Sequence, residues 1–225
     1  MAPTSTDNAE KKSYVITVLI DNPKSWFLPY GHRLVQLLAE RGHDVCLVTS
    51  ANELRSGDIA FFLACEKVVG SELRSRNKHN LVVHASALPK GKGWSPVTWQ
   101  VLEGATEIPV TLFEAADAVD AGDVYAAETI HLDGHELVDE LREKQASATF
   151  RLALQFVDAS PPRIGRRQEG ESTYHPRRHP PDSELDPNKS IVDLFNLLRV
   201  VDNERYPAFF KHRGHTYRLE IHKQR

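Results

Sequence analysis

Short apolar runs alternate with longer amphipathic stretches along the first part of the chain. Residues 14–20 form a β-branched run of the kind found in strands that are buried on both faces. Residues 31–41 carry leucines at helical spacing and are followed by Gly42, a common helix stop. A second apolar run lies at 44–48. This succession of strand, helix and strand predicts a βαβ unit with parallel strands and a right-handed crossover.

The same alternation continues to residue 157. The predicted strands are 59–63, 81–84, 109–113 and 123–130, the predicted helices are 96–103 and 136–157, and 72–76 is a connection. The last helix has an apolar stripe that we expect to pack in the core. The pattern therefore predicts the α/β class, as a Rossmann-like open, mostly parallel sheet with flanking helices.

The composition changes after residue 159. Residues 160–187 contain six prolines and many charges and have no apolar periodicity, which predicts an extended segment that wraps the surface or is partly disordered. A helix at 190–201 and strands at 209–211 and 216–221 predict a small C-terminal unit. The expected organisation is a disordered N-terminus at 1–12, an α/β core at 13–159, a Pro/Arg-rich connecting segment at 160–189, and a helix with a β-hairpin at 190–225.

Composition and charge narrow the class of partner. With 225 residues, 40% of them hydrophobic, the chain can bury one ordinary core and a small appendage. A net charge of -3 gives no general basic field, so nucleic acid is not an expected partner. The local cluster of basic residues at 163–178 is typical of a solvated loop.

Cysteine content and hydropathy predict a soluble protein of the cytoplasm. Cys46 and Cys65 lie within or beside predicted strands, which favours small buried side chains over a disulfide framework. The N-terminus is polar, and no stretch reaches the about 18 apolar residues that would span a bilayer. No association with a membrane is expected.

Candidate chemistry is concentrated at 84–96 and 119–123. His84 ends a predicted strand, and ligands bind at the carboxyl ends of the strands in open parallel sheets. A histidine at that edge is held by the sheet and can reach a substrate. Asp120 and Asp123 flank a short Ala-Gly pair in a predicted loop.

The order of residues in these stretches resembles the formyltransferases that use N10-formyltetrahydrofolate. That family includes methionyl-tRNA, glycinamide ribonucleotide and sugar N-formyltransferases. Its motif runs Asn-x-His-x-Ser-x-Leu-Pro, a Gly-containing loop, a helix with Pro and Trp, a strand, and Leu-Asp-x-Gly-Asp. The matching residues here are His84, Ser86, Leu88, Pro89, Gly93, Pro96, Trp99, Gly104, Val110, Thr111, Asp120, Gly122 and Asp123.

The resemblance implies that His84 and Asp120 carry the chemistry. An amine attacks the formyl carbon, an oxyanion develops, and the amine must lose a proton before the folate nitrogen leaves. A histidine can accept that proton or stabilise the oxyanion, and a carboxylate can orient its ring. The family has a catalytic Asn two residues before the histidine, where this chain has Val82. Asn80 is a weaker candidate, because four strand residues span about 13 Å.

The resemblance also assigns binding residues. The folate would lie against Leu63, Cys65, Lys67, Ala116, Asp117, Val119 and Asp120. The amine substrate would contact Ser86, Lys90, Lys92 and Trp94. The acceptor indicated is the amine of a nucleotide-linked amino-deoxysugar, carried by dTDP or UDP, because the tail is similar to the short C-terminal unit of sugar N-formyltransferases. Its diphosphate could also meet the basic cluster at 163–178.

Other interpretations stay open. The protein could formylate an aminoacyl group on a carrier protein, or it could be a non-catalytic folate-binding member of the fold. Asp123 is more typical of a turn, and Ser86 of a loop cap, than of a catalytic group. His175 and His179 have metal-like spacing, but the neighbouring arginines oppose a cation, so no metal is expected. The C-terminal hairpin could offer an edge strand for a homodimer.

Overall fold

The computed structural model describes residues 12–160 and 163–224. The disorder expected at 1–12 falls almost wholly outside these residues. The chain forms two compact units, residues 1–80 and residues 81–225. This division differs from the organisation at 13–159, 160–189 and 190–225 that the composition suggests, which stays a prediction.

The first unit contains the predicted βαβ arrangement. Its elements are β1 (Val15–Leu19), α1 (Leu28–Ala39), β2 (Asp44–Val48), the 3-10 turn η1 (Ala51–Glu53), β3 (Gly57–Phe62), α2 (Ser71–Arg74) and the start of β4 (Asn77–His84). The strand order is β2-β1-β3, and both pairs are parallel, as predicted. Helix α1 begins three residues before the predicted start, because Pro29 is well tolerated in a first turn.

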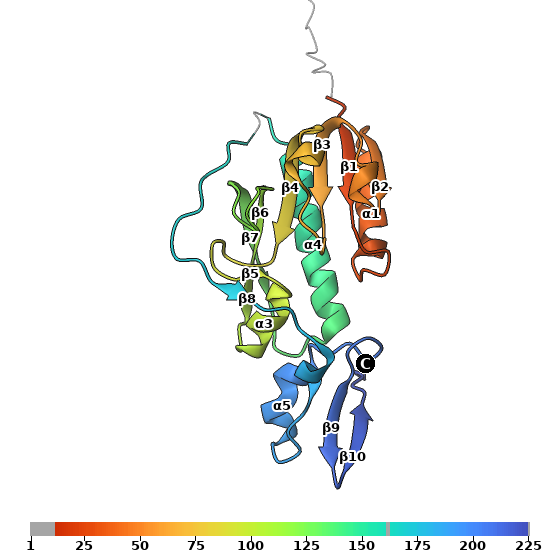
Figure 1. The fold of residues 1–225 in the computed structure, drawn as a ribbon, viewed down its shortest axis with the longest axis vertical. Coiled ribbons are helices and arrows are strands. Elements are labelled where there is room, and N and C mark those ends of the chain that lie inside the picture. The colour runs from red at the N-terminus through yellow and green to blue at the C-terminus, as the bar shows by residue number, and fades with distance from the viewer. Residues whose placement is uncertain (1–11, 161–162, 225) are drawn as a thin grey trace, which may run out of the picture. The chain divides into compact units, whose positions relative to one another are not determined.

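The second unit contains the end of β4 and the rest of the chain. Its further elements are β5 (Lys92–Gly93), α3 (Pro96–Leu102), β6 (Glu107–Glu114), β7 (Val124–His131), α4 (Val138–Val157), β8 (Tyr174–His175), η2 (Pro180–Ser183), α5 (Ile191–Leu198), β9 (Ala208–His212) and β10 (His215–Leu219). The strand order is β4-β6-β7. Helix α4 packs along β7 and β6 (Figure 1) and buries the predicted apolar stripe.

Strands β4, β6 and β7 of the second unit are antiparallel, which the apolar pattern did not indicate. Strand β6 runs against both β4 and β7. A short loop rather than a helical crossover joins β6 to β7, and such a connection returns the chain in the opposite direction. The sheet is therefore open and mixed, with flanking helices, and the predicted α/β class is confirmed.

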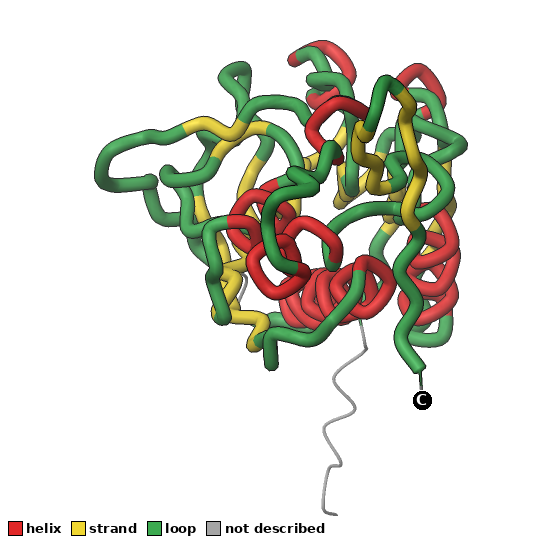
Figure 2. Tube along the Cα trace, turned by 90° about the horizontal axis from the view of Figure 1, so that it is seen from below, coloured by secondary structure: helices red, strands yellow, loops and turns green. Residues whose placement is uncertain are grey.

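The C-terminal part of the second unit has its own apolar cluster. This cluster consists of Leu185, Leu194, Leu198, Val201 and Ala208. Beyond β10 the described chain continues as a loop to residue 224 (Figure 2). Among residues 12–160 and 163–224, no helix is both long and apolar enough to cross a membrane.

A buried ion pair links this part to the start of α4. Arg199, which follows α5, donates from its guanidinium to Glu136 Oε2 at 2.8 Å and to the Glu136 carbonyl at 2.9 Å. The Glu136 carboxylate also accepts the backbone N–H groups of Asp133 and Gly134. Because Glu136 closes this turn, α4 begins at Val138 and not at the predicted Glu136.

Candidate active site

His84 is the last residue of β4, where it pairs with Thr111 of β6. Its ring is buried, and Nε2 lies 2.8 Å from the carbonyl oxygen of Gly91. A carbonyl can only accept, so Nε2 carries the hydrogen and the neutral ring has its lone pair on Nδ1. The histidine is thus held in one tautomer by the loop that follows it.

The second group of the site, Asp120, approaches that lone pair from another loop. Its Oδ2 lies 3.8 Å from Nδ1 of His84, and both side chains are about nine-tenths buried. The same oxygen accepts the backbone N–H of Gly93 at 2.9 Å. The structure therefore brings the two predicted catalytic residues close together. The separation is too long for a direct hydrogen bond and would become that of an ion pair when the His84 ring is protonated.

The strand β5 orients both side chains. Gly91, just before it, accepts from His84, and Gly93, within it, donates to Asp120. At Gly93 the φ angle is +94°, and an added Cβ would lie 2.6 Å from the carbonyl oxygen of His175. A side chain at this position would separate the two strands that meet here.

Strand β5 is held in turn by the connecting segment. It pairs in parallel with β8 (Figure 1), with Lys92 opposite Tyr174 and Gly93 opposite His175. The backbone N–H of Lys92 donates to the Thr173 carbonyl, and that of Trp94 donates to the His175 carbonyl. The side-chain oxygen of Thr173 accepts the N–H of Gly91 at 2.9 Å. Residues of the connecting segment are thus part of the site.

The Asp120 loop has a second support from this segment. Gln168 donates from Nε2 to the carbonyl oxygens of Asp120, at 3.0 Å, and Gly122, at 2.9 Å. An added Cβ at Gly122 would lie 1.7 Å from the backbone oxygen of Glu114, so only glycine fits there. The position of Asp123 favours the turn interpretation, because its carbonyl accepts the N–H of Glu114.

The predicted substrate residues occupy different surroundings. Ser86 is buried beside Gly91, and its Oγ has no hydrogen-bond partner among the described residues. Lys92 is 6% exposed, and its ammonium lies 6.0 Å from the centre of the Tyr174 ring. Trp94 is half-buried under the guanidinium of Arg177, 4.4 Å from the ring centre, and Lys90 is exposed. Ser86 does not cap the loop with its hydroxyl; its backbone carbonyl instead accepts from Thr111.

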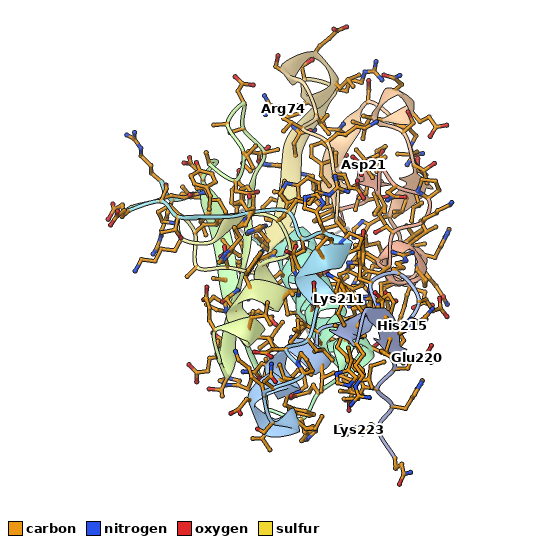
Figure 3. The ribbon with its side chains drawn as sticks, turned by 60° about the horizontal axis from the view of Figure 1, so that its bottom comes forward. Asp21, Arg74, Lys211, His215, Glu220 and Lys223 are labelled. Atoms are coloured by element: carbon orange, nitrogen blue, oxygen red, sulfur yellow. The ribbon has the colours of Figure 1, made fainter. Side chains whose placement is uncertain are left out.

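The candidate folate residues Leu63, Cys65 and Lys67 belong to the first unit and follow β3. Leu63 is buried, and the carboxylate of Asp21 (labelled in Figure 3) accepts the backbone N–H of Lys67 and of its neighbour Glu66 at 2.8 Å each. Burial, followed by the nearby Asp21 carboxylate, raises the pKa of the Cys65 thiol to about 12. This loop therefore has a fixed backbone and an unreactive cysteine.

The remaining candidates are Asn80 and three residues of the loop between β6 and β7. Asn80, in the first unit, donates from its side-chain amide to the carbonyl of Arg74 at 3.0 Å, so its amide serves the start of β4. Ala116, Asp117 and Val119 lie in the loop between β6 and β7 that also carries Asp120. Asp117 and Val119 are exposed, and Ala116 is half-buried. They stay predictions for the folate site.

Three residues that contribute to the site were not predicted from the sequence as site residues. Gln168, Thr173 and His175 lie in a stretch without apolar periodicity, where the sequence indicated only a basic cluster and a metal-like histidine spacing. In the structure the His175 ring stacks on Trp99, with ring centres 6.0 Å apart, and lies beside Gly91. Within residues 12–160 and 163–224, no group of three or more His, Cys, Asp or Glu side chains could hold a metal ion.

Comparison with known proteins assigns the chain to a family. The family model described as "Formyl transferase" matches residues 9–156, about two thirds of the chain. The chain belongs to the formyl transferase family. The match includes both His84 and Asp120 and ends before the connecting segment, so the residues that hold β5 lie outside it.

Curated proteins similar to this chain include methionyl-tRNA formyltransferases. The chain is 29% identical over 176 residues to a methionyl-tRNA formyltransferase of Lachnospira eligens, covering 75% of this chain and 55% of that protein. The chain spans about half the length of the curated relatives it matches.

Solved structures share the fold. A likely sugar N-formyltransferase from Mycobacterium tuberculosis, Rv3404c, superposes with a TM-score of 0.73 at 19% identity, covering 92% of this chain and 97% of that chain. HypX from Aquifex aeolicus in complex with tetrahydrofolic acid superposes with a TM-score of 0.72 at 18% identity, covering 93% and 38%. At these identities the likeness shows the fold alone.

Proposed function

We propose that the protein moves a formyl group from N10-formyltetrahydrofolate to the amine of a nucleotide-linked amino-deoxysugar. The observation that carries this proposal is the approach of His84 Nδ1 to Asp120 Oδ2, 3.8 Å apart, in a chain of the formyl transferase family. A basic nitrogen and a carboxylate, both mostly buried, suit a reaction that moves a proton while charge develops on an oxygen.

The tautomer of His84 defines its part in the reaction. With Nε2–H donated to Gly91, Nδ1 is the basic atom and accepts the proton that the attacking amine loses as its nitrogen bonds to the formyl carbon. The carboxylate of Asp120 stabilises the imidazolium that results. The same proton can then pass to the folate nitrogen as its bond to the formyl carbon breaks, which returns His84 to its starting state.

Cationic and aromatic side chains near β5 support a phosphorylated acceptor. Lys92 is largely buried, and no carboxylate pairs with its ammonium among the described residues. Arg177 covers Trp94 and presents a guanidinium, which suits bidentate contact with a phosphate. A sugar diphosphate would supply an anion for the Lys92 ammonium and an acceptor for the Arg177 guanidinium, and the likely sugar N-formyltransferase of the same fold matches the chain over almost its whole length.

A second candidate acceptor is methionyl-tRNA. It is favoured by the 29% identity to a methionyl-tRNA formyltransferase. Against it, the net charge of the chain is -3, and tRNA binding relies on a basic surface. The sugar therefore stays the preferred acceptor, and the tRNA belongs in the test.

The test is a mass-spectrometric screen of acceptors with N10-formyltetrahydrofolate. The panel contains dTDP- and UDP-linked amino-deoxysugars, methionyl-tRNA, and an aminoacyl group on a carrier protein. We expect a gain of one formyl group on a nucleotide sugar alone. Formylation of the tRNA or of the carrier-bound group would replace the proposed acceptor. Binding of a folate analogue without transfer to any of these acceptors would indicate a non-catalytic member of the fold.

A further inference from the structure

Thr173 lies directly behind the group that fixes the tautomer of His84. Its Oγ1 accepts the Gly91 N–H at 2.9 Å, and the Gly91 carbonyl accepts from His84 Nε2 at 2.8 Å. Gly91 is thus the single residue that links the Thr173 side chain to the imidazole of His84. Loss of the Thr173 oxygen would free the Gly91 N–H and let the acceptor of His84 shift.

Gln168 likewise supports Asp120 through the backbone of its loop. It donates to the carbonyl oxygens of Asp120 and Gly122, on both sides of the loop residue Ala121. Asp120 has a φ of +49°, a left-handed conformation that residues with a Cβ rarely adopt. Such a conformation persists only where the surroundings hold it, and Gln168 provides two of the bonds that do so.

We propose that Thr173 and Gln168 are positioning residues of the active site, which act through Gly91 on His84 and through the loop backbone on Asp120. This inference rests on the proposed formyl transfer. Neither side chain contacts the His84 or Asp120 side chain itself, and both lie beyond residues 9–156 that match the family model. The connecting segment therefore positions the catalytic side chains and is more than a linker.

The first test compares Thr173→Val, Thr173→Ser and wild-type protein. Valine keeps the shape and removes the acceptor, and serine restores it. We expect Thr173→Val to lower kcat roughly three- to tenfold with KM unchanged, as the loss of one positioning hydrogen bond would, and Thr173→Ser to recover most of the rate. Thr129→Val, on the exposed face of β7, is the matched control and should keep the wild-type rate.

The second test replaces the Gln168 donor. Gln168→Glu keeps the size but turns the donor into an acceptor that faces two carbonyl oxygens, so kcat should fall by more than tenfold. Gln155→Glu, exposed on α4, introduces the same charge change away from the site and should have no effect. Thermal melts of all variants establish that they are folded.

A measurement without substrate separates this inference from the proposed function. The ¹⁵N resonances of the His84 imidazole report which nitrogen carries the hydrogen, and their pH profile should move in Thr173→Val and return in Thr173→Ser. If wild-type protein transfers formyl while the Thr173→Val and Gln168→Glu variants keep its kcat and its His84 resonances, the positioning role is refuted and the function stands. If wild-type protein transfers no formyl, the function fails, and the resonances alone decide whether Thr173 positions His84.

Discussion

Nδ1 of His84 and Oδ2 of Asp120 lie 3.8 Å apart, and each side chain is held in place by a different residue of one glycine-rich loop. Gly91 accepts from the histidine, and Gly93 donates to the aspartate. The two side chains therefore do not depend on each other for their orientation. Removal of one should leave the other in place, which makes single substitutions informative.

Substitution of either catalytic residue should greatly reduce the rate of transfer without unfolding the protein. Proton transfer by a positioned side chain contributes about 10²–10⁴-fold to a rate, so His84→Ala and Asp120→Ala should each lower kcat by about that factor. Steady-state kinetics and circular dichroism measure the two effects. His131→Ala, at an exposed histidine that ends β7, is the matched control. Activity retained in both site variants would remove the basis of the mechanism.

Val82 offers a gain-of-function test. Side chains two residues apart in a strand share a face, so Val82 lies on the His84 side of β4 and Val83 on the opposite side. An amide at position 82 would add a donor for the developing oxyanion, and we expect Val82→Asn to raise kcat about tenfold. Val83→Asn is the control for a polar residue in the same strand. Equal rates in the two variants would show that an added donor at position 82 does not assist the reaction.

Gly122 should tolerate no side chain. A Cβ there would lie 1.7 Å from the backbone oxygen of Glu114, so the loop that carries Asp120 must move. We expect Gly122→Ala to lower the free energy of unfolding by about 2 kcal/mol or more and to lower kcat as well. Gly70→Ala is the comparison, because nothing lies within 4 Å of a Cβ at that position. Urea titration and kinetics on both variants provide the measurement.

The carboxyl group of Glu136, which pairs with Arg199, should make stability depend on pH. Burial opposes ionisation of Glu136, but hydrogen bonds from the backbone N–H of Asp133 and other donors prevail and lower the pKa of this carboxyl to about 2 from 4.5. The folded-state pKa is depressed, so the contribution to stability is present above pH 4.5 and is lost as the pH falls toward 2.

Glu136→Gln tests this dependence. Removal of one partner of a buried pair costs about 3–5 kcal/mol, so the variant should be less stable than wild type by about that amount at pH 7. The difference should shrink steadily as the pH falls below 4.5. Urea unfolding at a series of pH values measures it, with Glu103→Gln, an exposed site, as the control. A difference that is constant with pH would contradict an ionised Glu136.

Cys65 should resist alkylation in the folded protein. Its pKa of about 12 leaves very little thiolate at pH 8, and the thiolate is the reactive form. Iodoacetamide followed by peptide mass spectrometry should label Cys65 only slowly in the native protein and rapidly in urea. Rapid labelling of the native protein would show that burial and the Asp21 carboxylate do not raise the pKa of the Cys65 thiol.

The fold was predictable where the apolar pattern is continuous. The strand predicted at 44–48 coincides with β2, and the helix predicted at 96–103 differs from α3 by one residue. The direction of β6 and β7 was not predictable in this way, because the apolar run of a buried strand such as β6 does not reveal its direction, and β7 is only partly buried. Topology depends on the loops between the strands, which carry no apolar signal.

The candidate site was also only partly predictable from the sequence. His84 and Asp120 could be named from the ordered motif, and the structure places them together. The pairing of β5 with β8 joins two-residue strands about 80 residues apart in the chain, one in a Gly-rich loop and one in a Pro-rich segment. Neither has periodicity, and no local propensity specifies a pairing at such a separation. Thr173 and Gln168 were missed for this reason.

The pairing of β5 with β8 also determines which fragments of this protein could work. A truncated chain that stops at residue 156, where the family match ends, would keep His84 and Asp120 but lose Gln168, Thr173 and β8. During synthesis the imidazole and the carboxylate would be made long before the residues that brace them. Chimeras or minimal versions of this protein should therefore extend through the arginines at 177 and 178 before any catalytic competence is expected of them.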